Sequence, residues 1–518
     1  MRRSQLINKK MVETFSSDAQ RHPVFPIARA ILVIVSILVL VCPTFAVAAE
    51  QSQPVQGPAP SAESDEGLKE RVKSLEQTVE ELKKDRGSPK VGESNVKSME
   101  GYQAPTAGTS AEVPEHERER GMLRQDPYAD PRVDNAPFDP QLRGFFRLPG
   151  TQTMLRLGGF ARTDLIHDFS PAGNTSKFVT SSIPTGPNPG NDNTSMSVAP
   201  SRISVELRSN TNYGPLRIYY ENDFNNGPNT TNSFRLRHFY GQWQNILVGQ
   251  TWSAWEDADA IPDTVDFEGP NSWIFRLQPQ ARYTYAINKE NIIAASVEQP
   301  NTEMQGTATL PNGTVNTINS TSPIPDFVLR YRYEESKFHI QNAWLFRSLG
   351  GFVGAESEKQ VFGWGGMVSA AATVYGKDNV MAQGIIGNGI ARYVNDLGSG
   401  TALDVGIKPD GTIVALPTWG AYGSYQHFWA ERWRSAVTYG YLHVNTTNIA
   451  SPTLTGNSNT NFKSTQYAEA NLMYSPGAGF TTGVGLLWGQ HTEKTGERGD
   501  AFRLNFVLQY DLVNLGNW

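Results

Sequence analysis

The sequence predicts an all-β transmembrane barrel of about 16 antiparallel strands, and three observations support this. From residue 154 onward, short runs alternate apolar and polar side chains between clusters of Gly, Asn, Pro and Ser, a pattern typical of membrane strands and their connections. No apolar run after the N-terminus reaches the roughly 18–20 residues that a spanning helix needs. Arginines recur on the polar faces, and so many charged groups need water rather than a dry core.

Residues 1–49 are predicted to be a signal peptide. Basic residues precede the apolar run 31–41, and Ala46, Val47 and Ala48 offer a small-residue cleavage site. The apolar run is too short to span a membrane, and Cys42, the single cysteine, would leave with it. We therefore expect an exported chain without disulfides, in the outer membrane of a Gram-negative bacterium.

Three segments are expected between the signal peptide and the barrel: a disordered linker at 50–67, a short coiled coil at 68–86 and a Pro-rich linker at 87–153. Apolar residues in the second segment alternate spacings of four and three, as coiled-coil core positions do. These residues are Leu68, Val72, Leu75, Val79 and Leu82. So short a segment is unstable alone, so we expect it to assemble in the periplasm on a trimeric barrel. The alternative is a solvated charged helix.

The barrel is assigned to residues 154–518. The expected strands lie near 154–169, 201–209 and 215–224, then in three runs between 233 and 285, and near 291–299, 326–334, 337–347, 360–374, 378–392, 416–428, 431–444, 465–475, 480–490 and 500–512. The last run places Phe506, Leu508 and Tyr510 on one face, and the chain ends on Trp518. A terminal aromatic after an alternating strand resembles the insertion signal of outer-membrane barrels.

An acidic loop is expected at about 254–272 and contains no basic residue. Its carboxylates are Glu256, Asp257, Asp259, Asp263, Asp266 and Glu268. We expect this loop to fold into the lumen as a constriction opposite the arginines, because facing rows of opposite charge orient dipolar solutes. The alternative is an extracellular loop that binds divalent cations between lipopolysaccharides or lies at a trimer contact.

Arginines on the inferred lumen faces are the candidates for lining the pore. They are Arg202, Arg208, Arg217, Arg235, Arg237, Arg276 and Arg282. A guanidinium offers a planar fork to a carboxylate and stays charged, so these residues predict a path for small organic anions. Alternatively, they pair with the acidic loop and hold it inward, and both roles can hold together.

Several segments resemble the DcaP-like family of outer-membrane porins. They are GFFRLPGTQTMLRLGGFARTD, GQTWSAWEDADAIPDTVDFEGPN, RLQPQARYTY, QVFGWGG, KDNVMAQGIIGNGIARY and YQHFWAERWRS, in this order along the barrel. The resemblance implies a trimeric barrel of about sixteen strands with an N-terminal periplasmic coiled coil. It also implies uptake of small organic anions such as dicarboxylates.

The composition and motifs give no sign of other partners. After removal of residues 1–49, with six basic and two acidic side chains, the net charge changes from −6 to −10, which argues against nucleic acid. The glycine clusters do not open a helix as a phosphate loop would, the His residues lack ligand spacing, and no nucleophile elbow is found. We expect no catalytic residue, metal or cofactor.

The expected function is therefore passive diffusion of small hydrophilic solutes through the outer membrane, with lipid and lipopolysaccharide around the barrel. Three alternatives stay open. The barrel could be structural or adhesive without specific transport, it could be a barrel hydrolase, or the chain could be a soluble secreted β protein. A lack of conductance would distinguish the structural barrel from a porin, and a hydrolase would need a catalytic Ser and His near the lipid boundary. Dependence on detergent separates any membrane barrel from the soluble protein.

Overall fold

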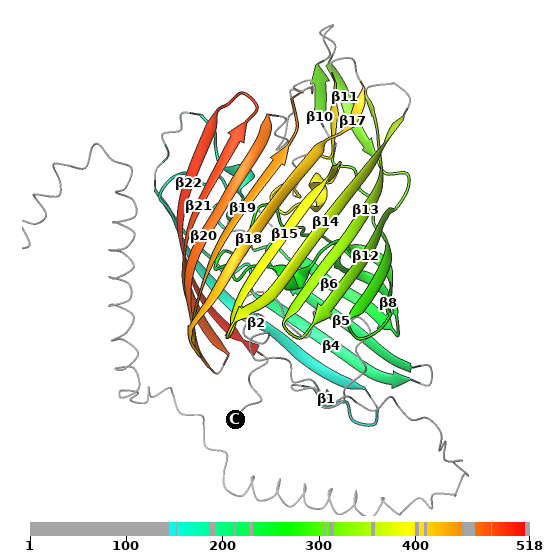
Figure 1. Ribbon diagram of the computed structural model, residues 1–518, viewed down its shortest axis with the longest axis vertical. Coiled ribbons are helices and arrows are strands. Elements are labelled where there is room, and N and C mark those ends of the chain that lie inside the picture. Colours follow the sequence, from blue (N-terminus) through cyan, green and yellow to red (C-terminus); the bar gives the residue numbers. More distant parts are fainter. Residues whose placement is uncertain are drawn as a thin grey trace, which may run out of the picture. The chain divides into compact units, whose positions relative to one another are not determined.

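The computed structural model describes residues 145–512, with gaps at 152, 187–189, 191, 212–213, 227–231, 305, 310–314, 354–357, 399–402, 409–411, 448, 450–460 and 478. Within this part, sixteen strands form a closed antiparallel barrel (Figure 1). The predicted signal peptide, the linker at 50–67, the coiled coil at 68–86 and the terminal Trp518 lie outside the described residues.

The barrel strands follow one another around the wall in chain order. They are β2 (Met154–Asp168), β4 (Arg202–Thr211), β5 (Gly214–Asp223), β6 (Arg235–Trp243), β7 (Ile246–Trp252), β8 (Leu277–Ala286), β9 (Asn291–Glu298), β12 (Asp326–Glu335), β13 (Phe338–Val353), β14 (Lys359–Tyr375), β15 (Asp378–Asn388), β18 (Pro417–Ala430), β19 (Trp433–Val444), β20 (Phe462–Gly477), β21 (Phe480–Glu493) and β22 (Arg498–Asp511). The barrel closes where β22 pairs with β2, from Phe160 opposite Asp511 to Asp168 opposite Arg503. The prediction of about sixteen strands is confirmed, and each predicted run overlaps one of them.

Shorter elements lie outside the sixteen strands. They are β1 (Phe146–Arg147), β3 (Asn193–Ser197), β10 (Gly306–Thr309), β11 (Val315–Thr321), β16 (Val405–Ile407), β17 (Ile413–Ala415) and the 3-10 helices η2 (Thr180–Ser182), η3 (Ala258–Ala260) and η4 (Ala391–Tyr393). β1 pairs with β2, so the predicted linker at 87–153 ends earlier than expected. Among the described residues, no helix has the length and hydropathy to cross a membrane.

The connections differ between the two ends of the barrel (Figure 1). At one end, which we call the turn end, most connections are two residues long, as between β12 and β13 or β18 and β19. At the opposite, loop end, most connections are longer, and three of them matter below. We call them the first loop (169–201), the constriction loop (253–276) and the sixth loop (389–416).

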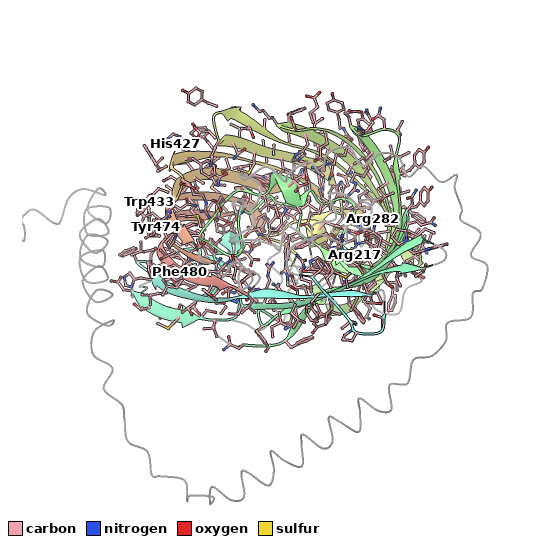
Figure 2. All side chains as sticks on the ribbon, turned by 90° about the horizontal axis from the view of Figure 1, so that it is seen from below. Arg217, Arg282, His427, Trp433, Tyr474 and Phe480 are labelled. Carbon is pink, nitrogen blue, oxygen red and sulfur yellow. The ribbon has the colours of Figure 1, made fainter. Side chains whose placement is uncertain are left out.

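Large apolar side chains point away from the lumen. On β12, Phe327, Leu329 and Tyr331 are exposed, whereas the alternate residues Arg330 and Arg332 are buried inside. Near the turn end, the outward Trp433 and Tyr474 stack with ring centroids 4.4 Å apart (Figure 2). Soluble monomers rarely expose an apolar band of this extent, and aromatic girdles mark the membrane interfaces of spanning barrels. The outer surface therefore fits lipid and argues against a soluble secreted protein.

Candidate constriction and pore lining

The constriction loop lies inside the barrel and packs against the strands on the side opposite β4, β5 and β6. The indole Nε1 of Trp255 donates to the carbonyl of Ala343 on β13 at 3.1 Å. Tyr422 on β18 donates to the carbonyl of Ala260 at 3.0 Å. Both Trp255 and Ala260 are fully buried, because the loop gives its apolar side chains to the wall instead of to water.

Two arginines bind the carboxylates of this loop. Arg332 on β12 lies 3.0 Å from Asp257 and 2.7 Å from Asp259. Farther along the loop, Arg434 on β19 lies 2.6 Å from Asp263. These pairs are almost completely buried, so removing one partner would leave an uncompensated buried charge. The loop is thus anchored by arginines outside the seven candidates.

The next part of the loop is held by Glu469 on β20. Its carboxylate accepts the backbone N–H groups of Val265 at 2.6 Å and Asp266 at 3.2 Å. Burial and the nearby charge of Glu469 raise the pKa of Asp266 to about 8. Burial likewise raises the pKa of Glu256 well above its ordinary value. Asp266 therefore favours the neutral form near pH 7, which weakens the acidic side of the constriction.

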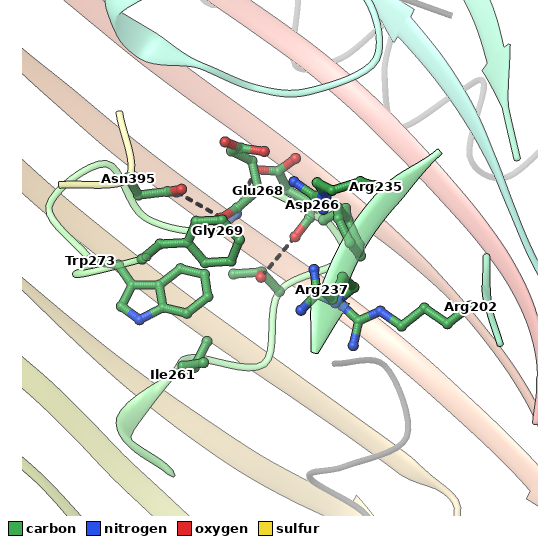
Figure 3. A pocket seen from close by; sticks show the side chains of 12 residues that line it. Arg202, Arg235, Arg237, Ile261, Asp266, Glu268, Gly269, Trp273 and Asn395 are labelled. Carbon is green, nitrogen blue, oxygen red and sulfur yellow. Dashed lines mark hydrogen bonds between the residues drawn. The ribbon is translucent and has the colours of Figure 1, made fainter. Parts of the chain in front are cut away.

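A small pocket of about 40 Å³ lies between the constriction loop and β4 and β6 (Figure 3). Arg202, Arg235 and Arg237 line one side of it. The other side is formed by residues of the constriction loop that include Asp266, Glu268 and Trp273. We call this space the constriction pocket.

The carboxylates that pair with these arginines come from the wall itself. Arg235 lies 2.5 Å from Asp223 on β5, and Arg237 lies 2.6 Å from Glu221. Both carboxylates project inward beside the guanidinium groups that they bind. Three guanidinium groups thus face two wall carboxylates, which leaves one positive charge in excess on this side.

Arg202 is the least satisfied of the three. Its Nε and Nη1 atoms make no hydrogen bond within the described part of the chain, and Glu221 approaches Nη1 only to 3.5 Å. The guanidinium lies over the rings of Phe160 and Phe267, at 5.2 and 5.4 Å from their centroids. A buried donor without a partner costs free energy that a bound anion would recover.

A second group of arginines lies nearer the turn end. Arg156, Arg208 and Arg217 all bind Glu206, at 2.6, 2.7 and 2.7 Å. We call these four residues the turn-end cluster. Three guanidinium groups share one carboxylate, so the four side chains carry a net charge of two positive units.

The last two candidate arginines lie elsewhere. Arg276 precedes β8 and donates to the carbonyl of Gly398 in the sixth loop at 3.2 Å, and burial lowers its pKa to about 10. Arg282 is buried on the inner face of β8, on the same side of the barrel as Arg217 in the view from the turn end (Figure 2). Neither residue lines the constriction pocket.

Asp396 in the sixth loop joins several segments over the lumen. Its carboxylate accepts the hydroxyl of Thr180 at 2.9 Å and the amide of Ser181 at 3.1 Å, both in the first loop. It also accepts the hydroxyl of Thr465 on β20 at 2.9 Å, and its own amide donates to the carbonyl of Asn271. Burial raises the pKa of Asp396 to about 6.

Sequence reasoning missed most of the partners in these contacts. They are Glu206, Glu221, Asp223, Asp396, Arg434 and Glu469. Five of them stand at inward positions of strands, so the alternation of apolar and polar residues already indicated that these side chains face the lumen. Pairing could not be read from that alternation, because it requires the register between strands and the path of the loop.

The described residues hold no group of three or more His, Cys, Asp or Glu side chains that could bind a metal ion. The geometry is that of an inward loop facing a basic wall.

Comparisons with known proteins give the following matches. A family model described as DcaP outer membrane protein matches residues 147–512, more than half of the chain. The outer membrane channel DcaP of Acinetobacter baumannii has a similar structure, with a TM-score of 0.60 and 19% identity, covering 72% of this chain and 100% of that one. The anion-selective porin from Comamonas acidovorans is 8% identical over 70% of this chain and 100% of its own, and its TM-score of 0.43 is too low to carry an argument. No curated protein matches.

Proposed function

The chain belongs to the DcaP outer membrane protein family and is an outer-membrane porin, and we propose that it favours small organic anions such as dicarboxylates. The constriction pocket supports this proposal. Its basic side carries three guanidinium groups against two wall carboxylates, and Arg202 keeps hydrogen-bond donors without acceptors there. A solute carboxylate can supply those acceptors through a charge-assisted hydrogen bond.

Transport is passive. An anion reaches the pocket from the loop end, is held by the excess positive charge, and leaves toward the turn end down its concentration gradient. Glu221 and Asp223 keep the affinity low, because each already neutralises part of the guanidinium charge. Weak binding is required for flux, since a tightly held solute would block the pore.

The experiment is single-channel recording of the purified protein in planar bilayers under a KCl gradient. The wild type should show a reversal potential of anion preference, and Arg202→Gln with Arg235→Gln should shift it toward zero. Arg432→Gln is the matched control, because this exposed residue lies in the turn between β18 and β19. Cation preference in the wild type would overturn the proposal. A barrel without conductance would favour the structural or adhesive alternative.

We also propose a homotrimer in which residues 68–86 associate in the periplasm and lipid and lipopolysaccharide surround the barrel. Short turns face the periplasm in outer-membrane barrels, so the position of β1, the first described strand, at the turn end supports this orientation. Deletion of residues 68–86 should leave conductance per barrel unchanged and lower the stability of the trimer. Native mass in detergent, with and without the deletion, measures this. A wild-type monomer would contradict it.

A further inference from the structure

The constriction pocket contains a carboxylate that the protein leaves unpaired. Glu268 lines the pocket from the constriction loop, whereas Arg202 lines it from β4 (Figure 3). The side chain of Glu268 is half-buried, and its carboxylate makes no ion pair or hydrogen bond with any residue that the structure describes. The backbone of Glu268 is fixed, because its carbonyl accepts the side-chain amide of Asn395 at 2.8 Å. The loop thus holds a free acceptor in the pocket.

Two other polar side chains on the loop side of the pocket are already occupied. Asp266 accepts the backbone N–H of Gly269 at 3.1 Å, and its raised pKa of about 8 favours the neutral form near pH 7. The hydroxyl of Thr264 donates to the carbonyl of Asp266 at 2.9 Å. Glu268 is therefore the loop side chain that is best placed to accept a hydrogen bond from a solute.

On the opposite side of the pocket, Arg202 is the donor that stays open. Arg235 donates from Nε and Nη2 to the two oxygens of Asp223, at 2.8 and 2.5 Å, and Arg237 binds both Glu221 and Asp223. The Nε and Nη1 atoms of Arg202 are buried and make no hydrogen bond within the described residues. A solute carboxylate therefore gains most at Arg202, where it meets donors that no described protein group satisfies.

We propose that the constriction pocket selects small carboxylates that carry a hydroxyl or ammonium group on the carbon next to the carboxylate. The inference rests on the proposed function, which supplies the carboxylate, and adds the second group that the solute carries. Arg202 donates to the solute carboxylate, and Glu268 accepts a charge-assisted hydrogen bond from the hydroxyl or ammonium group. The pocket of about 40 Å³ has room for about three water molecules, so it admits only the head of a solute. Both polar groups therefore belong to that head.

Glu268 makes the second group of the solute matter, because specificity is a difference between two affinities. A plain dicarboxylate satisfies Arg202 but brings no donor to Glu268, and the two negative charges repel each other. A hydroxyl or ammonium group satisfies Glu268 and offsets part of that repulsion. A plain carboxylate is thus admitted, and a substituted one is preferred.

The test compares succinate with L-malate, which have the same carbon chain and the same charge at pH 7.5 and differ by one hydroxyl group. Each solute is added to single channels in KCl, and the concentration that halves the conductance measures its affinity. L-Malate should act on the wild type at an about fivefold lower concentration than succinate, the size of one net hydrogen bond. Equal concentrations, or no block by either solute, would overturn the inference. Loss of anion preference under a KCl gradient would instead contradict the proposed function.

A variant without the acceptor assigns this preference to Glu268. Glu268→Met keeps the length of the side chain and removes both carboxylate oxygens, so the preference for L-malate over succinate should disappear. The loop should stay folded, because this carboxylate makes no hydrogen bond or ion pair with described residues. Glu431→Gln, in the exposed turn between β18 and β19, is the matched control and should keep the wild-type preference. A preference that survives Glu268→Met would overturn the inference.

A milder variant separates the charge of Glu268 from its acceptor oxygens. Glu268→Gln keeps an oxygen that accepts from a hydroxyl group but loses the charge that attracts an ammonium group. It should therefore lower the affinity for L-aspartate relative to succinate more than it lowers that for L-malate. An equal loss for both solutes would contradict direct contact between Glu268 and the second group.

Discussion

The two sides of the lumen use the same ionic side chains in different ways. On the arginine wall, formed by β4, β5 and β6, arginines bind carboxylates of neighbouring strands. On the anchoring wall, formed by β12 to β20, arginines bind carboxylates of the constriction loop. The arginine wall pairs Arg235 and Arg237 with carboxylates of its own strands, and Arg202 leaves an excess positive charge at the constriction pocket. The anchoring wall uses its charges to hold the loop.

Strand register explains the difference. Asp223 lies directly opposite Arg235 in the pairing of β5 and β6, and Arg156 lies opposite Glu206 in that of β2 and β4. Directly opposed side chains on one face are close enough to pair. Arg434, in contrast, binds Asp263, which is 171 positions away in the chain. The charge of an arginine therefore does not reveal its role in this lumen, and its partners distinguish the two walls.

The largest effect is expected from breaking the anchoring wall. Arg434→Ala leaves the carboxylate of Asp263 buried without its cation, a change that costs about 3–5 kcal/mol when both groups are desolvated. The constriction loop should detach locally, and the pore should widen. Single-channel conductance and the size limit for neutral sugars in liposome swelling should both rise. Arg235→Ala on the arginine wall is the control and should leave the size limit unchanged; a rise there would erase the distinction between the walls.

The junction at Asp396 should make the loops of the anchoring side sensitive to pH. Its pKa is near 3.8 when the loop is free and about 6 in the junction, so the junction binds more protons than the open state. Stability is therefore greatest below pH 4 and falls as pH rises through 6, by on the order of 3 kcal/mol. Hydrogen exchange of the Ser181 amide should be faster at pH 7.5 than at pH 5, after correction for intrinsic rates. Asp396→Asn should remove this dependence, and an unchanged dependence would exclude Asp396 as its source.

A smaller effect is expected on the arginine wall when its carboxylates are neutralised. Glu221→Gln with Asp223→Gln raises the excess positive charge in the constriction pocket by two units. Each charge is worth about 1 kcal/mol at 4 Å in a water-like medium, so anion preference should increase about fivefold per charge. Reversal potentials measure this at low salt, where screening is weakest. A shift toward cations would mean that the carboxylates position the arginines more than they neutralise them.

The smallest effect is expected from Arg276→Gln. This side chain contacts the sixth loop and lies outside the constriction pocket. The shift in reversal potential should be less than about half of that caused by Arg235→Gln, because a more distant charge is screened by salt. Recording both variants under one KCl gradient provides the comparison. An equal shift would place Arg276 on the solute path after all.

The sequence predicted the barrel strands well because each one meets two different solvents. On β12, for example, the alternation of Leu329 and Tyr331 with Arg330 and Arg332 follows from lipid on one side and the lumen on the other. The small strands in the loops have no such constraint. β16 is buried at all three of its positions, so it shows no alternation that could reveal it.

The candidate site was predictable in its residue types and not in its pairings. The alternation of side chains along β4 and β6 predicted that Arg202, Arg235 and Arg237 face the lumen, and the three residues line one pocket. Arg276 precedes the start of β8, so the same rule did not apply to it. Of the six carboxylates predicted to face those arginines, Asp266 and Glu268 line this pocket, and the other four do not. The rest depends on the path of the loop, which local sequence does not set.

The seam between β2 and β22 has a consequence for biogenesis. Neither strand can satisfy its outer row of backbone amides in lipid until the other has arrived, and they stand at opposite ends of the barrel sequence. Every intermediate that lacks β22 has two open edges and is excluded from the hydrocarbon layer. Assembly of the barrel is therefore all-or-none: a nascent chain truncated before residue 498 should accumulate as a chaperone substrate rather than as a smaller membrane protein.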